Sequence, residues 1–207
     1  MKTKDAFWDK TADKYAADPI ADLESYETKL ERTRGYFTPQ TRVLEIGCGT
    51  GSTALLHAPF VKHIHAIDFS QRMIEIAREK QAKEGIENIT FEVGDVEQAL
   101  AGNAKYDVVM AMSLLHLVDD RQALIRQVYD LLEPGGHFVS STVCLGDGAA
   151  FFKPIVFLGT TFLGWPRVSF FKAKQLTGDI EAAGFSIVHA WCPGPRKAHF
   201  LIAQKPA

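Results

Sequence analysis

The sequence VLEIGCGTG (residues 43–51) joins a short apolar run to a turn that has glycine at every second position. Val43, Leu44 and Ile46 favour a buried strand that is covered on both faces of a sheet. The three glycines that follow lack a Cβ atom, so their backbone can take positive φ and come close to a ligand. Glu45 lies inside the strand, where a carboxylate is costly unless it has a partner or a place at the mouth of a site. Together these features predict a ligand site at the carboxyl end of a first parallel strand.

The composition of the 207-residue chain indicates a single globular domain with a sizeable core. Hydrophobic residues make up 46% and charged residues 23%, which argues against disorder, and the net charge of −2 gives no sign of nucleic-acid binding. Cys48, Cys144 and Cys192 form no pair and no zinc pattern, so we expect free thiols, no metal site and a cytoplasmic location. Residues 1–15 lack the apolar run of a secretory signal, and no window is long and apolar enough for a transmembrane segment.

Apolar runs and turn residues predict strands and helices in alternation. The predicted strands are residues 43–46, 63–69, 89–93, 106–112, 137–143, 185–191 and 198–204. The predicted helices are residues 5–35 (broken at Asp18-Pro19), 52–58, the stretch between an N-cap at Ser70 and a stop at Gly85, 119–132 and 172–183. This alternation is typical of an α/β chain with a doubly wound parallel sheet. Residues 193–197 are too short for a crossover helix, so the last two strands must form an antiparallel hairpin.

Two classes of ligand fit a glycine turn after a first strand. A dinucleotide fits because residues 49–54 satisfy G-x-G-x-x-A and Asp68 lies near the spacing expected of a ribose-binding acid. S-adenosylmethionine is the alternative. It is favoured by the glycines at every second position behind Glu45, by a second acid, Asp95, after the third strand, and by the terminal hairpin.

As a set, these motifs resemble the class I S-adenosylmethionine-dependent methyltransferases. The resemblance is carried by LEIGCGTGS (44–52), HIHAIDFS (63–70), ITFEVGDVE (89–97), KYDVVMAMSLLHLVDD (105–120), LLEPGGHFV (131–139) and EAAGF (181–185). It covers about residues 40–145 and 172–205. It implies a Rossmann-like methyltransferase fold, with a mostly parallel seven-stranded sheet and an antiparallel C-terminal strand. No Asn-Pro-Pro-Tyr sequence follows the fourth strand, so the small-molecule branch, which methylates O, N or C, is the better match.

The resemblance also implies roles for individual residues around S-adenosylmethionine and its product S-adenosylhomocysteine. Gly47, Gly49 and Gly51 would pack against the methionyl part, and Glu45 would act through water or backbone near the ammonium. The remaining implied contacts are Asp68 to the ribose hydroxyls, Phe69 and Met73 flanking the adenine, Asp95 and the Val96 backbone at the adenine edge, and Ser113 and Leu114 under the sulfonium. From the residues alone, Asp68 and Asp95 could instead serve as cap and turn residues, and Met73 could belong to the core. Cys48 is interpreted as a small spacer, because no base is placed beside it.

His116 is the candidate catalytic residue, because it lies in the loop after the fourth strand, where a methyl acceptor would bind. Its imidazole could take a proton from a hydroxyl or amine near neutral pH. The alternative is a histidine hydrogen-bonded within a surface loop. Methyl transfer from a sulfonium needs little acid–base help, since holding the two reactants in line supplies much of the rate.

Two segments fall outside the resemblance. Residues 1–38 carry Trp8 and Tyr15, which would either close over the site as a lid or pack as an amphipathic helix. Residues 146–171 form an apolar insertion between the cofactor-binding half (40–145) and the C-terminal helix and hairpin (172–207). The stretch 149–171 would line an apolar acceptor pocket, touch a membrane surface, pair two subunits of a homodimer, or wrap the core of a monomer.

The sequence therefore predicts an S-adenosylmethionine-dependent methyltransferase acting on a small, apolar or amphipathic acceptor. The alternatives are an NAD-dependent oxidoreductase and a non-catalytic S-adenosylmethionine-binding protein.

Overall fold

The structure, a computed structural model, describes residues 4–95, 104–148, 158–160, 165–194 and 197–207. Val96 and most of the apolar segment 149–171 therefore lie outside the described residues, and so do the expectations placed on them. The two described parts of that segment include Leu158 and Trp165, whose side chains are exposed, and Phe171, which is buried in the core.

Seven strands form one sheet in the order β3-β2-β1-β4-β5-β7-β6. β1 to β5 pair in parallel, whereas β7 is antiparallel to both β5 and β6, which confirms the predicted fold class and the terminal hairpin. The strands are β1 (Arg42–Ile46), β2 (His63–Asp68), β3 (Ile89–Val93), β4 (Tyr106–Met112), β5 (Leu132–Val143), β6 (Ser186–Trp191) and β7 (Ala198–Gln204).

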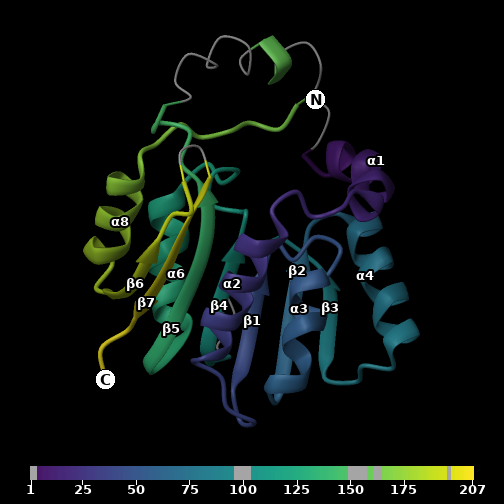
Figure 1. The fold of residues 1–207 in the computed structure, drawn as a ribbon, viewed down its shortest axis with the longest axis horizontal. Helices are drawn as coiled ribbons and strands as arrows, with labels where there is room; N and C mark the ends of the chain where they lie inside the picture. Colours follow the sequence, from purple (N-terminus) through teal and green to yellow (C-terminus); the bar gives the residue numbers. More distant parts are fainter. Residues whose placement is uncertain (1–3, 96–103, 149–157, 161–164, 195–196) are drawn as a thin grey trace.

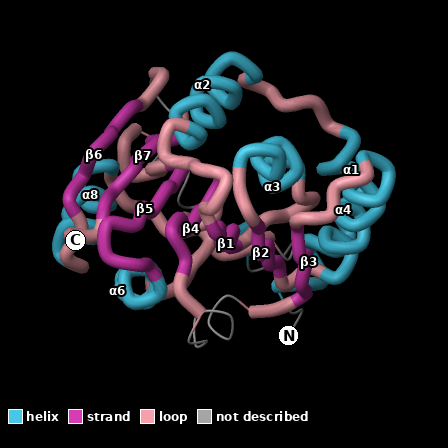
Figure 2. The backbone as a smooth tube through the Cα atoms, turned by 90° about the horizontal axis from the view of Figure 1, so that it is seen from below, coloured by secondary structure: helices cyan, strands magenta, loops and turns pink. Residues whose placement is uncertain are grey.

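Helices cover both faces of this sheet, as the views in Figures 1 and 2 show. One face carries α2 (Leu23–Arg34), α3 (Ser52–His57) and α4 (Gln71–Glu84), and the other carries α6 (Arg121–Leu131) and α8 (Ala173–Ala182). α1 (Lys4–Ala17) packs on the outer side of α4, and a short 3-10 helix (Ala58–Phe60) follows α3. The apolar side chains of β1 alternate between the two cores, since Leu44 and Ile46 belong to one and Val43 to the other.

Local signals explain where the helices begin and end. The Ser70 hydroxyl accepts a hydrogen bond from the Met73 amide at the start of α4, and Gly85 ends that helix in the left-handed conformation, as predicted. Asp120 caps α6 in the same way through the Ala123 amide. Asp18 and Pro19 separate α1 from α2, which confirms the predicted break.

Four predicted strand boundaries differ from the structure. Two differ by a single residue at the start of the strand, since β1 begins at Arg42 and β6 at Ser186. β2 ends at Asp68 and leaves Phe69 outside the strand. β5 was expected to begin at His137, but it begins at Leu132, directly after α6. The reason is an irregularity in the pairing, in which Leu132 pairs with Tyr106 and the next pair joins His137 to Val108.

Among the described residues, no helix combines the length and the apolar character needed to cross a lipid bilayer.

Candidate active site

The carboxyl ends of β1, β4 and β5 border a cavity of about 480 Å³. Parallel strands bring their carboxyl ends to one edge of a sheet, which is where ligands bind in open α/β folds. The opposite wall comes from the end of α1, the start of α2 and the link between them. The lining residues are Tyr15, Ala16, Asp18, Pro19, Ile20, Ala21, Asp22, Tyr26, Lys29, Glu45, Gly47, Cys48, Gly49, Thr50, Ser52, Thr53, Met112, Ser113 and Ser141.

The three glycines of the turn have positive φ but different surroundings. At Gly49, which lines the cavity, a Cβ atom would meet nothing within 4 Å, so this position is open to a ligand. At Gly47 a Cβ atom would lie 2.8 Å from the side chain of Leu114. At Gly51 it would lie 2.6 Å from the ring of Phe91, and Gly51 does not line the cavity. Gly51 thus packs closely against β3, and its contact with a ligand stays a prediction.

Glu45 lies at the floor of the cavity with 1% of its surface exposed. Its Oε2 atom has no hydrogen-bond partner among the described residues. Burial, reinforced by the nearby charge of Asp68, raises the pKa of Glu45 to about 8. A buried carboxyl oxygen that has no partner among the described residues is costly, so this residue is suited to a cationic ligand that enters the cavity.

Asp68 joins the end of β2 to the glycine turn. Its Oδ2 accepts a hydrogen bond from the Gly49 amide and its Oδ1 from the Ser70 amide, each at 2.9 Å. Burial raises the pKa of Asp68, and these two hydrogen bonds oppose that shift. Each carboxylate oxygen keeps a free lone pair, although Asp68 is not among the lining residues of this cavity.

Two of the residues expected around an adenine ring follow the ends of the neighbouring strands β2 and β3, where the Gly94 amide donates to the Asp68 carbonyl at 3.0 Å. Asp95 is exposed beyond the end of β3, and Phe69 is half-buried after β2. Met73 is 2% exposed and packs with Ala12 and Ile76 between α1 and α4, so its position is that of a core residue. The roles of Phe69 and Asp95 stay predictions.

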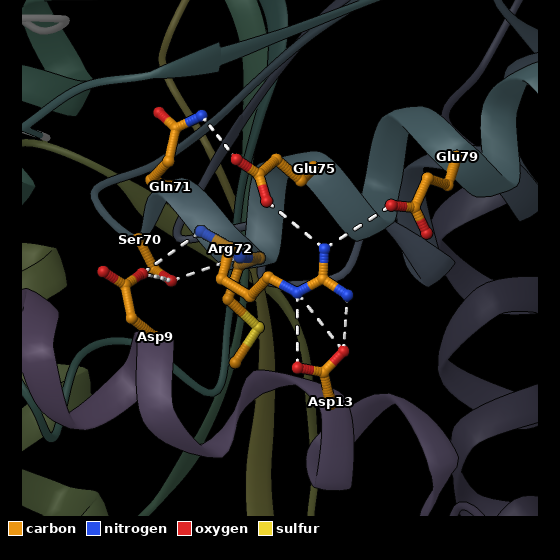
Figure 3. A network of polar contacts seen from close by, with 8 residues as sticks. Asp9, Asp13, Ser70, Gln71, Arg72, Glu75 and Glu79 are labelled. Atoms are coloured by element: carbon orange, nitrogen blue, oxygen red, sulfur yellow. Dashed lines mark hydrogen bonds and ion pairs between the residues drawn. The ribbon is translucent and has the colours of Figure 1, made fainter.

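The N-terminal helix is attached to α4 by a network of polar contacts (Figure 3). The Ser70 hydroxyl donates to Asp9 at 2.5 Å, and the Arg72 guanidinium pairs with Asp13 at 2.6 Å. This attachment places Tyr15 at the cavity, but Trp8 packs against Tyr15 and the cluster around Met73. Of the two lid candidates, only Tyr15 lines the cavity.

Sequence reasoning missed the contribution of α2. Tyr26 and Lys29 lie three residues apart on one face of this helix and both line the cavity. The Tyr26 hydroxyl lies 3.0 Å from that of Thr53, which ties α2 to α3. Lys29 is the one basic side chain among the described lining residues, and burial lowers its pKa. Helical spacing alone could have shown that Tyr26 and Lys29 share a face of α2. It could not have shown that this face borders the cavity.

The loop after β4 brings Ser113 to the cavity, where its φ of 58° is unusual for a residue other than glycine. Leu114 is buried against Gly47 and does not line the cavity. His116 is half-buried and also lies outside the described lining. Its Nδ1 has no partner in the described part of the chain, and burial lowers its pKa.

Two other kinds of chemistry find no support at this site. Burial raises the pKa of the Cys48 thiol well above its usual value, so Cys48 is a poor nucleophile. No group of three or more His, Cys, Asp or Glu side chains within the described ranges could hold a metal ion.

The strand order with its terminal antiparallel hairpin and the glycine turn after β1 define the class I S-adenosylmethionine-dependent methyltransferase fold. Residues 37–165, well over half of the chain, match a family described as a methyltransferase domain, and the chain belongs to that family. This membership does not favour the NAD-dependent oxidoreductase that the glycine turn alone had left open.

Individual relatives agree with this assignment. A demethylmenaquinone methyltransferase of Leptospira interrogans is 36% identical over 113 residues, which are 52% of this chain and 45% of that protein. The chain thus spans less than half the length of that relative.

Two solved structures share the fold. The YcgJ protein from Bacillus subtilis has a TM-score of 0.72 at 17% identity, covering 87% of this chain and 99% of that one. The N-methyltransferase NodS from Bradyrhizobium japonicum, in complex with S-adenosyl-L-homocysteine, has a TM-score of 0.69 at 18% identity. The match covers 100% of this chain and 94% of that one.

Proposed function

We propose that this protein transfers the methyl group of S-adenosylmethionine to a small-molecule acceptor and releases S-adenosylhomocysteine. The observation that carries the proposal is the buried carboxyl group of Glu45, whose Oε2 has no hydrogen-bond partner among the described residues and which lines the same cavity as the open backbone of Gly49. Burial favours the protonated form of this group, and a cationic ligand in the cavity would favour the ionised form instead. The donor carries an ammonium and a sulfonium, and both would lie near the floor of the cavity.

The charges of the cavity wall fit the zwitterionic end of the donor. Glu45 at the floor would receive the ammonium, directly or through water, and Lys29 on α2 would face the carboxylate. Asp68 would accept hydrogen bonds from the ribose hydroxyls through its free lone pairs. The backbone amides of Gly49 and Ser70 fix the orientation of its carboxylate. Phe69, Asp95 and the backbone of Val96 would complete the adenine side, and Ser113 would lie near the sulfur.

The bound donor supplies an activated methyl group on a cationic sulfur. The protein then has to align the acceptor with this methyl group and exclude water, which can account for much of the rate. Tyr15 and Tyr26 line the cavity and would contribute to both tasks. His116 would take the proton from a hydroxyl or amine acceptor, because its lowered pKa keeps the imidazole neutral near pH 7.

We further propose an apolar or amphipathic acceptor. The support is the name of the Leptospira interrogans relative, which gives demethylmenaquinone as its substrate, together with the exposed side chains of Leu158 and Trp165. Exposed apolar side chains of this kind would also allow transient contact with a membrane surface that holds such acceptors.

Calorimetry with S-adenosylhomocysteine and NADH tests the donor, and binding of NADH alone would reject the proposal. A screen with radiolabelled methyl donor over quinone precursors, lipids and small polar acceptors tests the reaction. Donor binding without transfer to any acceptor would favour the non-catalytic alternative. Transfer to small polar acceptors alone would refute the apolar acceptor.

A further inference from the structure

Lys80 reaches from α4 to the glycine turn without lining the cavity. Its ammonium donates to the hydroxyl of Thr50 at 3.0 Å and to that of Ser52 at 3.1 Å. These two residues flank Gly51, and both line the cavity. Lys80 thus forms hydrogen bonds with two residues that line the cavity, although it is not itself a lining residue.

The direction of these hydrogen bonds follows from the chemistry of the groups. An ammonium has no lone pair, so it can only donate, and both hydroxyls must accept. Each hydroxyl then keeps its single proton for another acceptor. Within the described part of the chain, neither the Thr50 nor the Ser52 hydroxyl donates to any group, although both residues border the cavity.

The turn does not need Lys80 to hold its shape. The Gly51 amide donates to the Cys48 carbonyl at 3.1 Å, and the Cys48 amide donates to the Ile67 carbonyl at 3.0 Å. Phe91 and Ala77 pack directly against Gly51. The hydrogen bonds that Lys80 makes within the described residues go to these two side-chain hydroxyls and not to the backbone of the turn, so its effect falls on the orientation of the hydroxyls.

We propose that Lys80 is a positioning residue that turns the hydroxyls of Thr50 and Ser52 into a pair of hydrogen-bond donors for an anionic oxygen of the ligand. Under the proposed function, on which this inference rests, that oxygen belongs to the carboxylate of S-adenosylmethionine, the single anionic group of the donor. Because each hydroxyl already accepts from a cation, its proton is a stronger donor than that of a free hydroxyl.

The test compares two ligands that differ in the amino-acid half. S-adenosylhomocysteine carries the carboxylate, whereas 5′-methylthioadenosine keeps the adenosine and the thioether but lacks the amino-acid group. For Lys80→Met we expect S-adenosylhomocysteine to bind about tenfold more weakly by calorimetry, and 5′-methylthioadenosine to bind within twofold of wild type. Lys80→Arg, which can still donate to both hydroxyls, should restore most of the affinity.

Lys83→Met is the matched control, because it removes the same charge from an exposed position in the last turn of the same helix. It should leave both affinities unchanged. The double variant Thr50→Val/Ser52→Ala should reproduce the selective loss, and adding Lys80→Met to it should cost little more. This double variant also tests the proposal if Lys80→Met does not fold.

Equal weakening of both ligands, or unchanged binding of S-adenosylhomocysteine, in Lys80→Met or in the double variant would overturn the inference. In contrast, a wild-type protein that binds neither ligand would refute the proposed function itself.

Discussion

The hydroxyl of Ser70 donates a hydrogen bond to the carboxylate of Asp9 at 2.5 Å and so joins the first turn of α4 to α1. The same hydroxyl accepts from the Met73 amide and thereby caps α4. One serine therefore starts a helix of the core and fixes the position of the N-terminal helix. Through this contact the end of α1, with Tyr15, is held against the cavity.

This attachment predicts different consequences for the two aromatic residues of α1. Trp8→Ala should lower the free energy of unfolding by about 1–3 kcal/mol, because Trp8 packs against the cluster of Ala12, Met73 and Ile76. Tyr15→Ala should change stability little, since its side chain is 55% exposed, but should weaken donor binding. Urea unfolding and calorimetry measure the two effects. Loss of stability without loss of affinity in Tyr15→Ala would reject a lid role.

Two glycines of the turn should respond differently to alanine. Gly51→Ala should destabilise the protein by about 2–4 kcal/mol, because the new Cβ atom would meet the Phe91 ring at 2.6 Å and the φ is +73°. Gly49→Ala should cost about 1–2 kcal/mol, since only the positive φ opposes it, yet it should weaken donor binding by projecting a methyl group into open space. Thermal unfolding measures the loss of stability in each variant, and calorimetry with S-adenosylhomocysteine measures the loss of donor-site affinity. Equal destabilisation would contradict this division of roles.

Glu45 should make the stability of the free protein depend on pH. With a pKa of about 8 in the folded state against 4.5 for an ordinary glutamate, the folded protein keeps a proton that the unfolded chain has released. The free energy of unfolding should therefore fall as pH rises from about 4.5 to about 8, by up to about 1.4 kcal/mol per pH unit. Asp68, whose pKa is also raised, contributes in the same direction.

Urea unfolding at several pH values, with Glu45→Gln as the comparison, isolates the effect of Glu45. In the variant, the free energy of unfolding should fall less steeply with rising pH, whereas the contribution of Asp68 is the same in both proteins. Parallel profiles would mean that Glu45 is ionised in the free protein.

His116→Gln tests the proposed general base. If the imidazole takes a proton from a hydroxyl or amine acceptor, kcat should fall by about 10²–10⁴ while donor affinity stays unchanged. The rate of the wild type should decline when the pH drops through the pKa of His116, which burial places below its usual value, because the protonated ring cannot accept. If the kcat of the variant is within threefold of the wild-type value, alignment of the acceptor with the methyl group suffices without a general base.

The amino-acid sequence by itself determined the order of strands and helices, the cap at Ser70 and the terminal hairpin. These features depend on side chains a few residues apart, such as the apolar alternation of a strand or the hydroxyl before a helix, so neighbouring residues are enough to encode them. The turn over residues 47–51 likewise marked the place of the site, since a glycine-rich backbone at the carboxyl end of a first parallel strand is suited to the close approach of a ligand. The early start of β5 at Leu132 escaped prediction because it depends on pairing with Tyr106 in another strand.

The tertiary structure alone decided which of these residues face a ligand. Gly49 opens into the cavity and Gly51 packs on Phe91, although the two glycines look alike in the sequence. Tyr26 and Lys29 of α2 meet Ser141 of β5 at the same cavity, although the two elements are far apart in the chain. A cavity forms where separate elements fail to fill the space between them, so its lining depends on packing across the whole fold and not on any local pattern.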